Sequence, residues 1–404
     1  MRAIVRDEYG TADVLKLEDV GKPTIGDDEV LLRAYGSSIN MGDRLVIRGA
    51  PYAMRLVLGL FRPRSRGTGQ DVAGRVEAVG ENVTEWVIGD ELYGEVTLGA
   101  TWAEYVVAPA SALARKPRGL TFEQAGSLPI AALTALEAVR DHGQVQVGAR
   151  VLVNGASGGV GSYVVQLAKA AGAEVTAVCT GTGLERAREF GAAHVIDYTK
   201  EDFTRSARAP DAERYDVMLD VAGSRTLAEC LTVLKPGGTY VAIGGPVDDP
   251  WIKPLLRLLW IALRGAFAKQ RVVIFVSKPC RENLDALSTL IAAGDLAPTY
   301  ESSCDLADLP AAMRDVEAGR RSGKVAIRIA RALAEDATTT LTPGPGTERR
   351  ARASGEAERT LRAWSLAERR VLSSKPVPPA RDRALSRSGP AANEEPDVSE
   401  AGTP

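Results

Sequence analysis

The chain has 404 residues, of which 45% are hydrophobic and 25% charged, and its formal net charge is −2. This length and composition are sufficient for two globular domains with their own cores. A net charge so close to zero gives no global field that attracts nucleic acid, so we expect no nucleic-acid partner. Any charged ligand must be held by local geometry.

The cysteines and the first residues bear on the compartment. Cys179, Cys230, Cys280 and Cys304 lie far apart without a C-x-x-C pair, which argues against a disulfide framework or a closed zinc site. The opening MRAIVRDEYG alternates apolar and charged residues and lacks the apolar core of a signal peptide. We therefore expect a reducing, cytoplasmic location.

The pattern of predicted strands and helices changes three times along the chain, and it predicts an α/β protein. Residues 1–125 contain short strands separated by glycine-bearing turns, which indicates a β-rich domain. Residues 126–265 alternate strand and helix, with apolar runs typical of buried parallel strands. Residues 266–330 return to strand, helix and strand, and they are too few for a third core. We expect them to rejoin the first domain.

Two further segments stand out. Residues 331–404 contain no Ile, Phe, Tyr, Met, Cys or His, and this composition predicts a disordered tail. The apolar stretch from Trp251 to Phe267 is interrupted by Lys253, Arg257 and Arg264, so it is not a membrane span. It is either a helix at an active-site rim or subunit interface, or a basic amphipathic helix on a membrane surface.

The strongest motif for chemistry is a glycine-rich turn between a strand and a helix. The predicted strand 150–153 runs into Asn154-Gly155-Ala156-Ser157-Gly158-Gly159-Val160-Gly161 and then into an amphipathic helix. A pyrophosphate needs backbone N–H groups without a Cβ in the way, and a helix amino terminus supplies them. Gly158, Gly159 and Gly161, with Ser157 and Val160 beside them, therefore predict a dinucleotide site.

The end of the second strand of this unit bears on the choice of dinucleotide. NAD-specific sites usually place a carboxylate there, whereas this chain has Val178-Cys179-Thr180-Gly181-Thr182-Gly183. Thr180, Thr182 and Arg186 can donate hydrogen bonds to a 2′-phosphate. We expect NADPH, with NADH as the alternative; Arg186 is otherwise an ordinary solvated helix residue.

The segments NGASGGVGSYVVQLAKAAGAEVTAVCT and REFGAAHVIDY resemble the cofactor domain of zinc-independent quinone oxidoreductases of the medium-chain dehydrogenase/reductase family. GQDVAGRVEAVG, VIGDELYG and SGKVAIRI resemble that family in the same order, so the resemblance covers residues 1–330. It implies a GroES-like catalytic domain interrupted by a doubly wound Rossmann domain. It also implies a homodimer.

The ligands of a catalytic zinc are missing from this chain. In alcohol dehydrogenases, which share the fold, a histidine stands at the position of Gln70 and a cysteine near Ser37 or Ser38. Both histidines, His142 and His194, and all four cysteines follow residue 140, so the first domain lacks these ligand types. We therefore expect no zinc.

Without a Lewis acid, conjugate reduction is easier than alcohol oxidation. Hydride then reaches a conjugated carbon of a small electrophile, which is a quinone or an α,β-unsaturated carbonyl compound. The negative charge spreads to the oxygen, where a hydrogen-bond donor can stabilise it. Two other classes stay open: an NADPH-binding sensor or scaffold without turnover, and a zinc-type alcohol dehydrogenase.

The candidate catalytic residues lie in the first domain. Ile39-Asn40-Met41-Gly42-Asp43 resembles the family's Asn-Pro-x-Asp turn, with Met41 and Gly42 replacing the proline step. Asn40 can bond a substrate oxygen or the cofactor ribose and Asp43 can orient a neighbour, unless both are only turn formers. Tyr52 is the candidate proton donor, or else a packed aromatic.

The resemblance also implies further cofactor residues. Thr134 matches a family threonine near the nicotinamide, although a helix threonine can instead bond its own backbone. Tyr198 would flank the adenine. Gly223, Gly244 and Gly245 end later strands where the cofactor would pass, or else serve as plain turn residues.

Overall fold

The computed structural model describes residues 1–206, 213–245, 253–321 and 323–330. The segment 331–404, predicted as a disordered tail, lies outside the described residues, as does Trp251, where the apolar stretch begins. Within the described part, no helix is long and apolar enough to cross a membrane.

The first domain is built on a seven-stranded sheet in the order β14-β15-β3-β4-β5-β7, with β6 paired to β3. The long strand β3 lies inside this sheet, between β15 and β4. Leu32 on β3 and Val72 on β4 are fully buried. A separate pair, β1 and β2, is antiparallel. The strands are β1 (Arg2–Val5), β2 (Lys16–Asp19), β3 (Glu29–Ile39), β4 (Asp71–Val79), β5 (Glu91–Glu95), β6 (Tyr105–Pro109), β7 (Leu113–Arg115), β14 (Ser302–Asp305) and β15 (Val325–Arg328).

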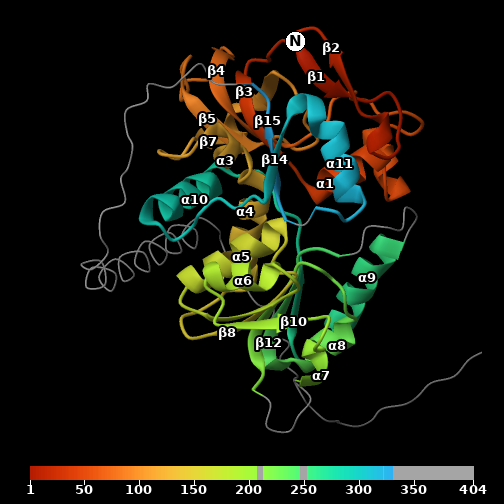
Figure 1. The fold of residues 1–404 in the computed structure, drawn as a ribbon, viewed down its shortest axis with the longest axis vertical. Helices are drawn as coiled ribbons and strands as arrows, with labels where there is room; N and C mark the ends of the chain where they lie inside the picture. Colours follow the sequence, from red (N-terminus) through yellow and green to blue (C-terminus); the bar gives the residue numbers. More distant parts are fainter. Residues whose placement is uncertain (207–212, 246–252, 322, 331–404) are drawn as a thin grey trace, which may run out of the picture. The chain divides into compact units, whose positions relative to one another are not determined.

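Strands β14 and β15 come from the end of the described chain, and Figure 1 shows them in blue beside the red and orange strands. Strand β15 pairs antiparallel with β3, so the first domain is completed only after the second has been traversed. The short helices of this domain are η1 (Ala12–Val14), α1 (Met41–Arg48), η2 (Tyr52–Met54), α2 (Arg55–Leu58), η3 (Ala110–Ala112), α3 (Phe122–Gly126), η5 (Leu306–Asp308) and α11 (Leu309–Glu317).

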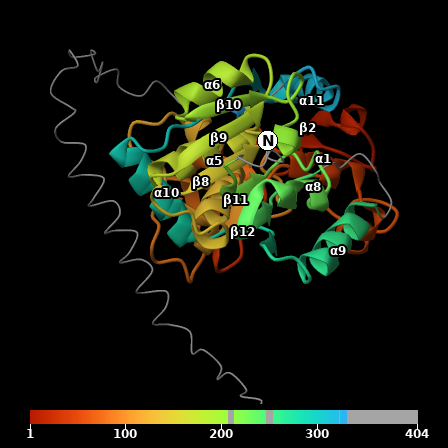
Figure 2. The ribbon, with the colours of Figure 1, turned by 90° about the horizontal axis from the view of Figure 1, so that it is seen from below.

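The second domain is a parallel six-stranded sheet in the order β10-β9-β8-β11-β12-β13, and Figure 2 shows the first five of these side by side. Apolar β-branched runs form these strands because both faces are covered by helices. The strands are β8 (Arg150–Asn154), β9 (Glu174–Cys179), β10 (His194–Asp197), β11 (Tyr215–Asp220), β12 (Leu234–Ala242) and β13 (Arg271–Ile274). The chain order reverses between β8 and β11, and ligands of doubly wound sheets bind at such a point.

The helices of the second domain follow the strands in turn. They are α5 (Gly159–Ala170), α6 (Gly183–Glu189), α7 (Phe203–Ser206), α8 (Leu227–Thr232) and α9 (Lys253–Gly265). At the junction of the domains lie α4 (Pro129–Leu136), its π-helical continuation η4 (Glu137–His142) and α10 (Arg281–Ala293). The hydroxyl of Tyr93 on β5 donates a 2.7 Å hydrogen bond to the carbonyl of Leu284, which ties α10 to the first domain.

One predicted boundary is wrong. The strand near residues 272–276 was expected to rejoin the first domain, but β13 pairs in parallel with β12 and completes the Rossmann sheet. The return therefore starts after β13 and not at residue 266. A hydrophobic strand does not reveal its partner, because either sheet buries it equally well.

Candidate functional site

The glycine-rich loop has the geometry of an anion site. Helix α5 begins at Gly159, its N-cap is Gly158, and no side chain caps its first N–H groups. An ideal Cβ on Gly161 would stand 2.1 Å from the carbonyl oxygen of Gly155, so a side chain there is excluded by backbone. These N–H groups at the carboxyl end of β8 are therefore available to a pyrophosphate.

Beside this loop, a buried carboxylate that the sequence analysis missed organises the crevice. Asp220, at the end of β11, accepts hydrogen bonds from Asn154 Nδ2 at 2.8 Å, Gly223 N at 2.8 Å and Tyr240 Oη at 2.7 Å. It therefore holds the ends of three neighbouring strands together at the topological switch point. An acid directly after the apolar run Val217-Met218-Leu219 was the available signal.

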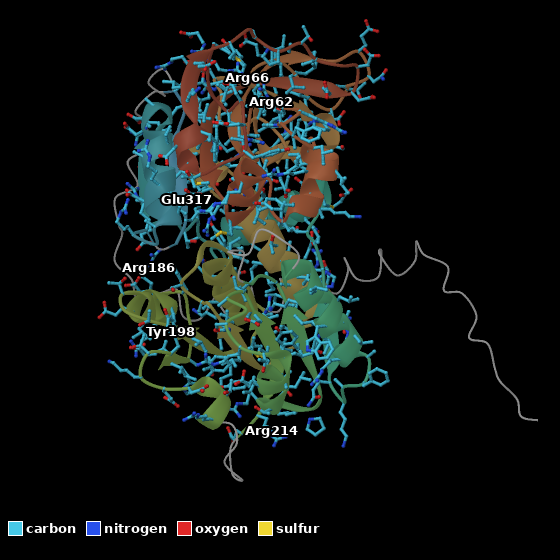
Figure 3. The ribbon with its side chains drawn as sticks, turned by 90° about the vertical axis from the view of Figure 1, so that its right-hand side faces the viewer. Arg62, Arg66, Arg186, Tyr198, Arg214 and Glu317 are labelled. Carbon is cyan, nitrogen blue, oxygen red and sulfur yellow. The ribbon has the colours of Figure 1, made fainter. Side chains whose placement is uncertain are left out.

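The residues predicted to bind the adenosine part of the cofactor lie on α6 and next to β10. Figure 3 shows Arg186 and Tyr198 at one edge of the domain, and Tyr198 is half exposed. The guanidinium of Arg186 lies 3.4 Å from a carboxylate oxygen of Glu301, so it already has an anionic partner. Thr182 precedes the amino end of α6 as its N-cap.

The end of β9 carries no acid, but an acid from the neighbouring strand β10 stands beside it. Asp197 ends β10, and its carboxylate accepts hydrogen bonds from the hydroxyl of Thr199 at 2.7 Å and from its backbone N–H at 3.1 Å. Those bonds, with one from Thr180, lower the pKa of Asp197 below its usual value. The carboxylate comes from the next strand along the sheet, which the register Asp197 to Cys179 places beside the end of β9.

The later glycines are required by the backbone itself. Gly223 has a φ of +60°, and an ideal Cβ on Gly244 would stand 2.3 Å from the carbonyl oxygen of Val221. Replacing Gly244 with valine therefore disturbs folding whether or not a cofactor passes there. Such a substitution is no test of cofactor binding.

A groove of about 670 Å³ opens next to Gly223, between α8 and α9. Arg257 of α9 spans its inner end, because its two terminal nitrogens donate to the carbonyl oxygens of Gly244 and Gly223, each at 3.3 Å. Its guanidinium also lies against Gly245. The predicted path along these three glycines is thus bordered by a cation from α9.

The predicted turn at Asn40 belongs to a buried polar cluster made of Ser38, Asn40, Asp71 and Lys324. One carboxylate oxygen of Asp71 accepts from the Asn40 amide at 2.9 Å, from the Lys324 ammonium at 3.0 Å and from the Ser38 hydroxyl. Its other oxygen accepts from the backbone N–H of Ile130 at 2.9 Å. Lys324 also donates to the amide oxygen of Asn40. Both ends of the Asn40 side chain are therefore bound within the protein.

Asp43 holds this turn in place. One of its oxygens accepts from the backbone N–H of Asn40 at 2.7 Å, which starts α1, and the other accepts from the Gln70 amide at 3.2 Å. The side chain is fully buried, and burial raises the pKa of Asp43 to about 7. Asp43 thus positions the turn that carries Asn40, because both of its oxygens are bound to protein groups.

Glu95 is a second acid that the sequence analysis did not single out. It ends β5 opposite Asp71, is only 6% exposed, and its Oε2 has no hydrogen-bond partner. Burial, followed by the charges of Asp71 and Glu137, raises the pKa of Glu95 to about 8. The protonated form of its carboxyl group is therefore favoured far more than in an exposed glutamate.

Tyr52 and Thr134 are the remaining candidates near the predicted site, and in the sequence both lie between members of the polar cluster. Tyr52 is in η2, partly exposed, with the Arg55 guanidinium 4.5 Å from its ring centroid. Thr134 is half-buried in α4, the helix that packs on α5. The hydrogen bonds of Asp71 and Lys324 described above are made with Ser38, Asn40 and Ile130.

The polar cluster and the glycine loop meet at Lys324. An ideal Cβ on Gly159 would lie 3.5 Å from Cδ of Lys324, an ordinary van der Waals contact. The side chain of Lys324 therefore runs along the start of α5 before its ammonium reaches Asp71. One residue thus borders both the predicted cofactor loop and the buried polar groups of the first domain.

The residues of this cluster do not fit a zinc ion. Gln70 stands where an imidazole ligand is expected and Ser38 where a sulfur ligand is expected, and an amide and a hydroxyl are poor zinc ligands. The ammonium of Lys324 already neutralises Asp71. In the described part of the chain, no group of three His, Cys, Asp or Glu side chains is arranged to hold a metal.

Comparison with known proteins supports the same fold over both domains. Residues 26–118 match the family model for the alcohol dehydrogenase GroES-like domain, and residues 190–327 match that for zinc-binding dehydrogenases. The chain is 32% identical to the mitochondrial NAD(P)H oxidoreductase RTN4IP1 of Bos taurus, over 81% of this chain and 89% of that protein. It is 33% identical to the 2-methylene-furan-3-one reductase of Solanum lycopersicum, over 81% and 79% respectively.

Among solved structures, the quinone oxidoreductase of Coxiella burnetii superposes with a TM-score of 0.71 at 27% identity, covering 82% of this chain and 99% of that one. The chain belongs to the medium-chain dehydrogenase/reductase family, in its quinone oxidoreductase-like branch. It is accordingly an enzyme, an oxidoreductase of this kind.

Proposed function

We propose that the chain is an NADPH-dependent, zinc-independent reductase that transfers hydride to a quinone or an α,β-unsaturated carbonyl compound. The observation that carries this proposal is the uncapped amino end of α5 next to a buried cluster in which the ammonium of Lys324 pairs with Asp71. The names of two relatives, an NAD(P)H oxidoreductase and a furanone reductase, point to the same chemistry.

The residues of the crevice have the chemistry to hold the cofactor, which supplies the hydride when bound. The N–H groups of Gly159, Val160 and Gly161 would receive the pyrophosphate, and Gly158, whose own N–H donates to the carbonyl of Gly155, would leave room for its approach. Thr180, Thr182 and Arg186 would donate to a 2′-phosphate, which favours NADPH, whereas Asp197 beside them favours NADH. Thr134, Tyr198, Gly223, Gly244 and Gly245 would line the remaining length.

Conjugate reduction suits a site without a Lewis acid. Negative charge that develops on the substrate oxygen is stabilised by fixed hydrogen-bond donors, which need no reorganisation during the reaction. The Lys324 ammonium and the Asn40 amide nitrogen are the proposed donors, because each keeps one N–H beyond the bonds that hold it to Asp71 and, for Lys324, to Asn40. Asp43 fixes the turn that carries Asn40. Tyr52 is the proposed proton donor to the carbon next to the carbonyl.

We further propose a reducing, cytoplasmic compartment and a homodimer. All four cysteines are free thiols, which supports a reducing compartment.

The test is oxidation of NADPH and of NADH, followed by absorbance, with metal-free protein and a panel of quinones, enones and simple aldehydes. Turnover of NADPH on quinones or enones is expected. Tight NADPH binding without turnover would favour a sensor or scaffold. Stoichiometric zinc in purified protein, with activity on alcohols, would favour an alcohol dehydrogenase.

The Tyr52→Phe variant tests the proton donor separately. It is expected to lower kcat while leaving the affinity for NADPH unchanged, because only the phenolic hydroxyl group is removed and the ring stays. An unchanged kcat would assign the proton to water or to another residue.

A further inference from the structure

Helix α9 carries an apolar stripe that faces away from the protein. Leu259 is 65% exposed, Leu263 53% and Phe267, just beyond the helix, 85%. Leu256 and Trp260 are also about half exposed, so these five positions follow the three-to-four residue spacing of one helical face. On the other side of the helix, Ile261 is buried in the core of the Rossmann domain. The helix is thus attached by its inner side and presents a second apolar side to the outside.

A second apolar segment lies in the first domain. Phe61 is 87% exposed, and Leu56, Val57 and Leu60 before it are each more than half exposed. They belong to α2 and the loop after it, which follows the turn at Tyr52. In both Figure 1 and Figure 2, this orange segment and α9 lie on the same side of the molecule.

The charged residues within both segments have one sign. From 251 to 271 the chain contains Lys253, Arg257, Arg264, Lys269 and Arg271 and no acid. From 55 to 66 it contains four arginines and no acid. Isolated exposed apolar residues are normal on a protein, but large contiguous patches mark an interaction site. In space, Arg66 is paired with Asp7 and Glu18, and the groove beside α9 also contains Asp202 and Glu229. The cations of the two segments outnumber these acids, so a patch with this excess of positive charge fits an anionic, apolar partner.

We propose that α9 and the segment 56–61 together form a surface that docks on an anionic lipid bilayer, with the apolar side chains inserted between headgroups. Interfacial helices combine an apolar face with lysine and arginine for this purpose. Each such cation near an anionic leaflet adds attraction, which decays over a Debye length and is weakened by salt. The surface is local, so it acts despite the overall charge of −2.

A second copy of the chain is a poorer occupant of this surface. In a two-fold contact the same patch meets itself, so the basic residues of one α9 would face those of the other. Neither segment has an acid with which to pair them, and like charges brought together in an interface are unfavourable. Anionic headgroups complement the same cations directly.

The test is co-sedimentation of the full chain with vesicles, either of phosphatidylcholine alone or with phosphatidylserine added. Binding is expected with phosphatidylserine vesicles, reduced at least fivefold on phosphatidylcholine alone and reduced by high salt. The double variant Leu259→Glu/Leu263→Glu, on the exposed stripe, should lower the partition coefficient at least tenfold. The matched control is Ile88→Glu/Val147→Glu, which adds the same charge at two exposed apolar positions elsewhere.

Three results would overturn the proposal. The full chain does not sediment with anionic vesicles, or the stripe variant binds as the control does. Alternatively, the stripe variant changes the oligomeric state in light scattering while vesicle binding is unaltered, which would assign the surface to self-association. Circular dichroism of each variant establishes that it is folded.

Discussion

The ammonium nitrogen of Lys324 lies 3.0 Å from Oδ2 of Asp71, and both side chains are almost completely buried. The pair joins the approach to β15 with the first residue of β4, which are more than two hundred residues apart in sequence. It therefore couples closure of the first domain to the site itself.

Substituting Lys324→Met should destabilise the protein by about 3–5 kcal/mol, because removing one partner of a buried pair leaves the other charge uncompensated. The double variant Asp71→Asn/Lys324→Met should recover part of this loss. Urea unfolding measures both. The control Lys22→Met removes an exposed pair with Glu77 and should cost no more than about 1 kcal/mol. A Lys324→Met protein as stable as this control would mean that the buried pair contributes little.

Gly158→Ala tests whether the glycine-rich loop binds the cofactor, without the folding defect expected of a substitution at Gly244. Gly158 has φ −72° and ψ 171°, which alanine adopts freely, and the new Cβ would make only an ordinary contact at 3.4 Å. The fold should therefore persist, while affinity for NADPH falls roughly tenfold or more because the Cβ occupies the approach to the N–H groups. Calorimetric titration measures the affinity.

Two comparisons accompany Gly158→Ala. Gly21→Ala has no atoms within 4 Å of its new Cβ and should change nothing. Gly161→Ala should disrupt folding itself, because its Cβ would overlap the Gly155 carbonyl. Unaltered NADPH affinity in folded Gly158→Ala would place the pyrophosphate elsewhere.

Asp197→Asn should shift the cofactor preference towards NADPH. A like-charge contact between the carboxylate and a 2′-phosphate costs about 1 kcal/mol in water, roughly a fivefold change in affinity. NADH lacks the phosphate, so its affinity should stay constant or fall. Binding of both dinucleotides is compared with Asp13→Asn, which removes an exposed acid in the first domain. If both affinities change equally, Asp197 does not distinguish the two cofactors.

The sequence predicts most of the fold because its local signals are strong. The apolar runs of β8, β9, β11 and β12 and the glycine turn before α5 can be recognised without any partner. Strand β13 was assigned to the wrong domain because strand pairing is not local. Asp197 was missed for the same reason: the acid reaches the cofactor end from the next strand, about eighteen residues beyond Cys179.

The buried polar cluster was still less accessible to prediction. Asn40 and Asp43 stood out as a turn, but the partners that give the turn its meaning, Asp71 and Lys324, lie in strands or beside them and look like ordinary charged residues. Only the antiparallel pairing of β15 with β3 brings Lys324 to Asn40. Charged residues inside a domain are explained by their partners, which a single sequence does not display.

Glu95→Gln should make the stability of the protein less dependent on pH. The folded-state pKa of Glu95, about 8, lies above the ordinary value of 4.5, so the folded state holds a proton that the unfolded state releases between these values. The contribution of Glu95 is thus fully present below about pH 4.5 and is lost as the pH rises through 8. While that proton is retained, stability falls by about 1.4 kcal/mol per pH unit on its account. Glutamine removes this slope, while Asp43, whose pKa is raised to about 7, keeps a slope of the same sign below pH 7, which is the larger part of the range. Urea unfolding from pH 5 to 8 measures the difference, with Glu77→Gln, an exposed acid, as the control. If Glu95→Gln and the control have equal slopes, the carboxyl group of Glu95 is ionised in the folded protein and must have a partner for its Oε2.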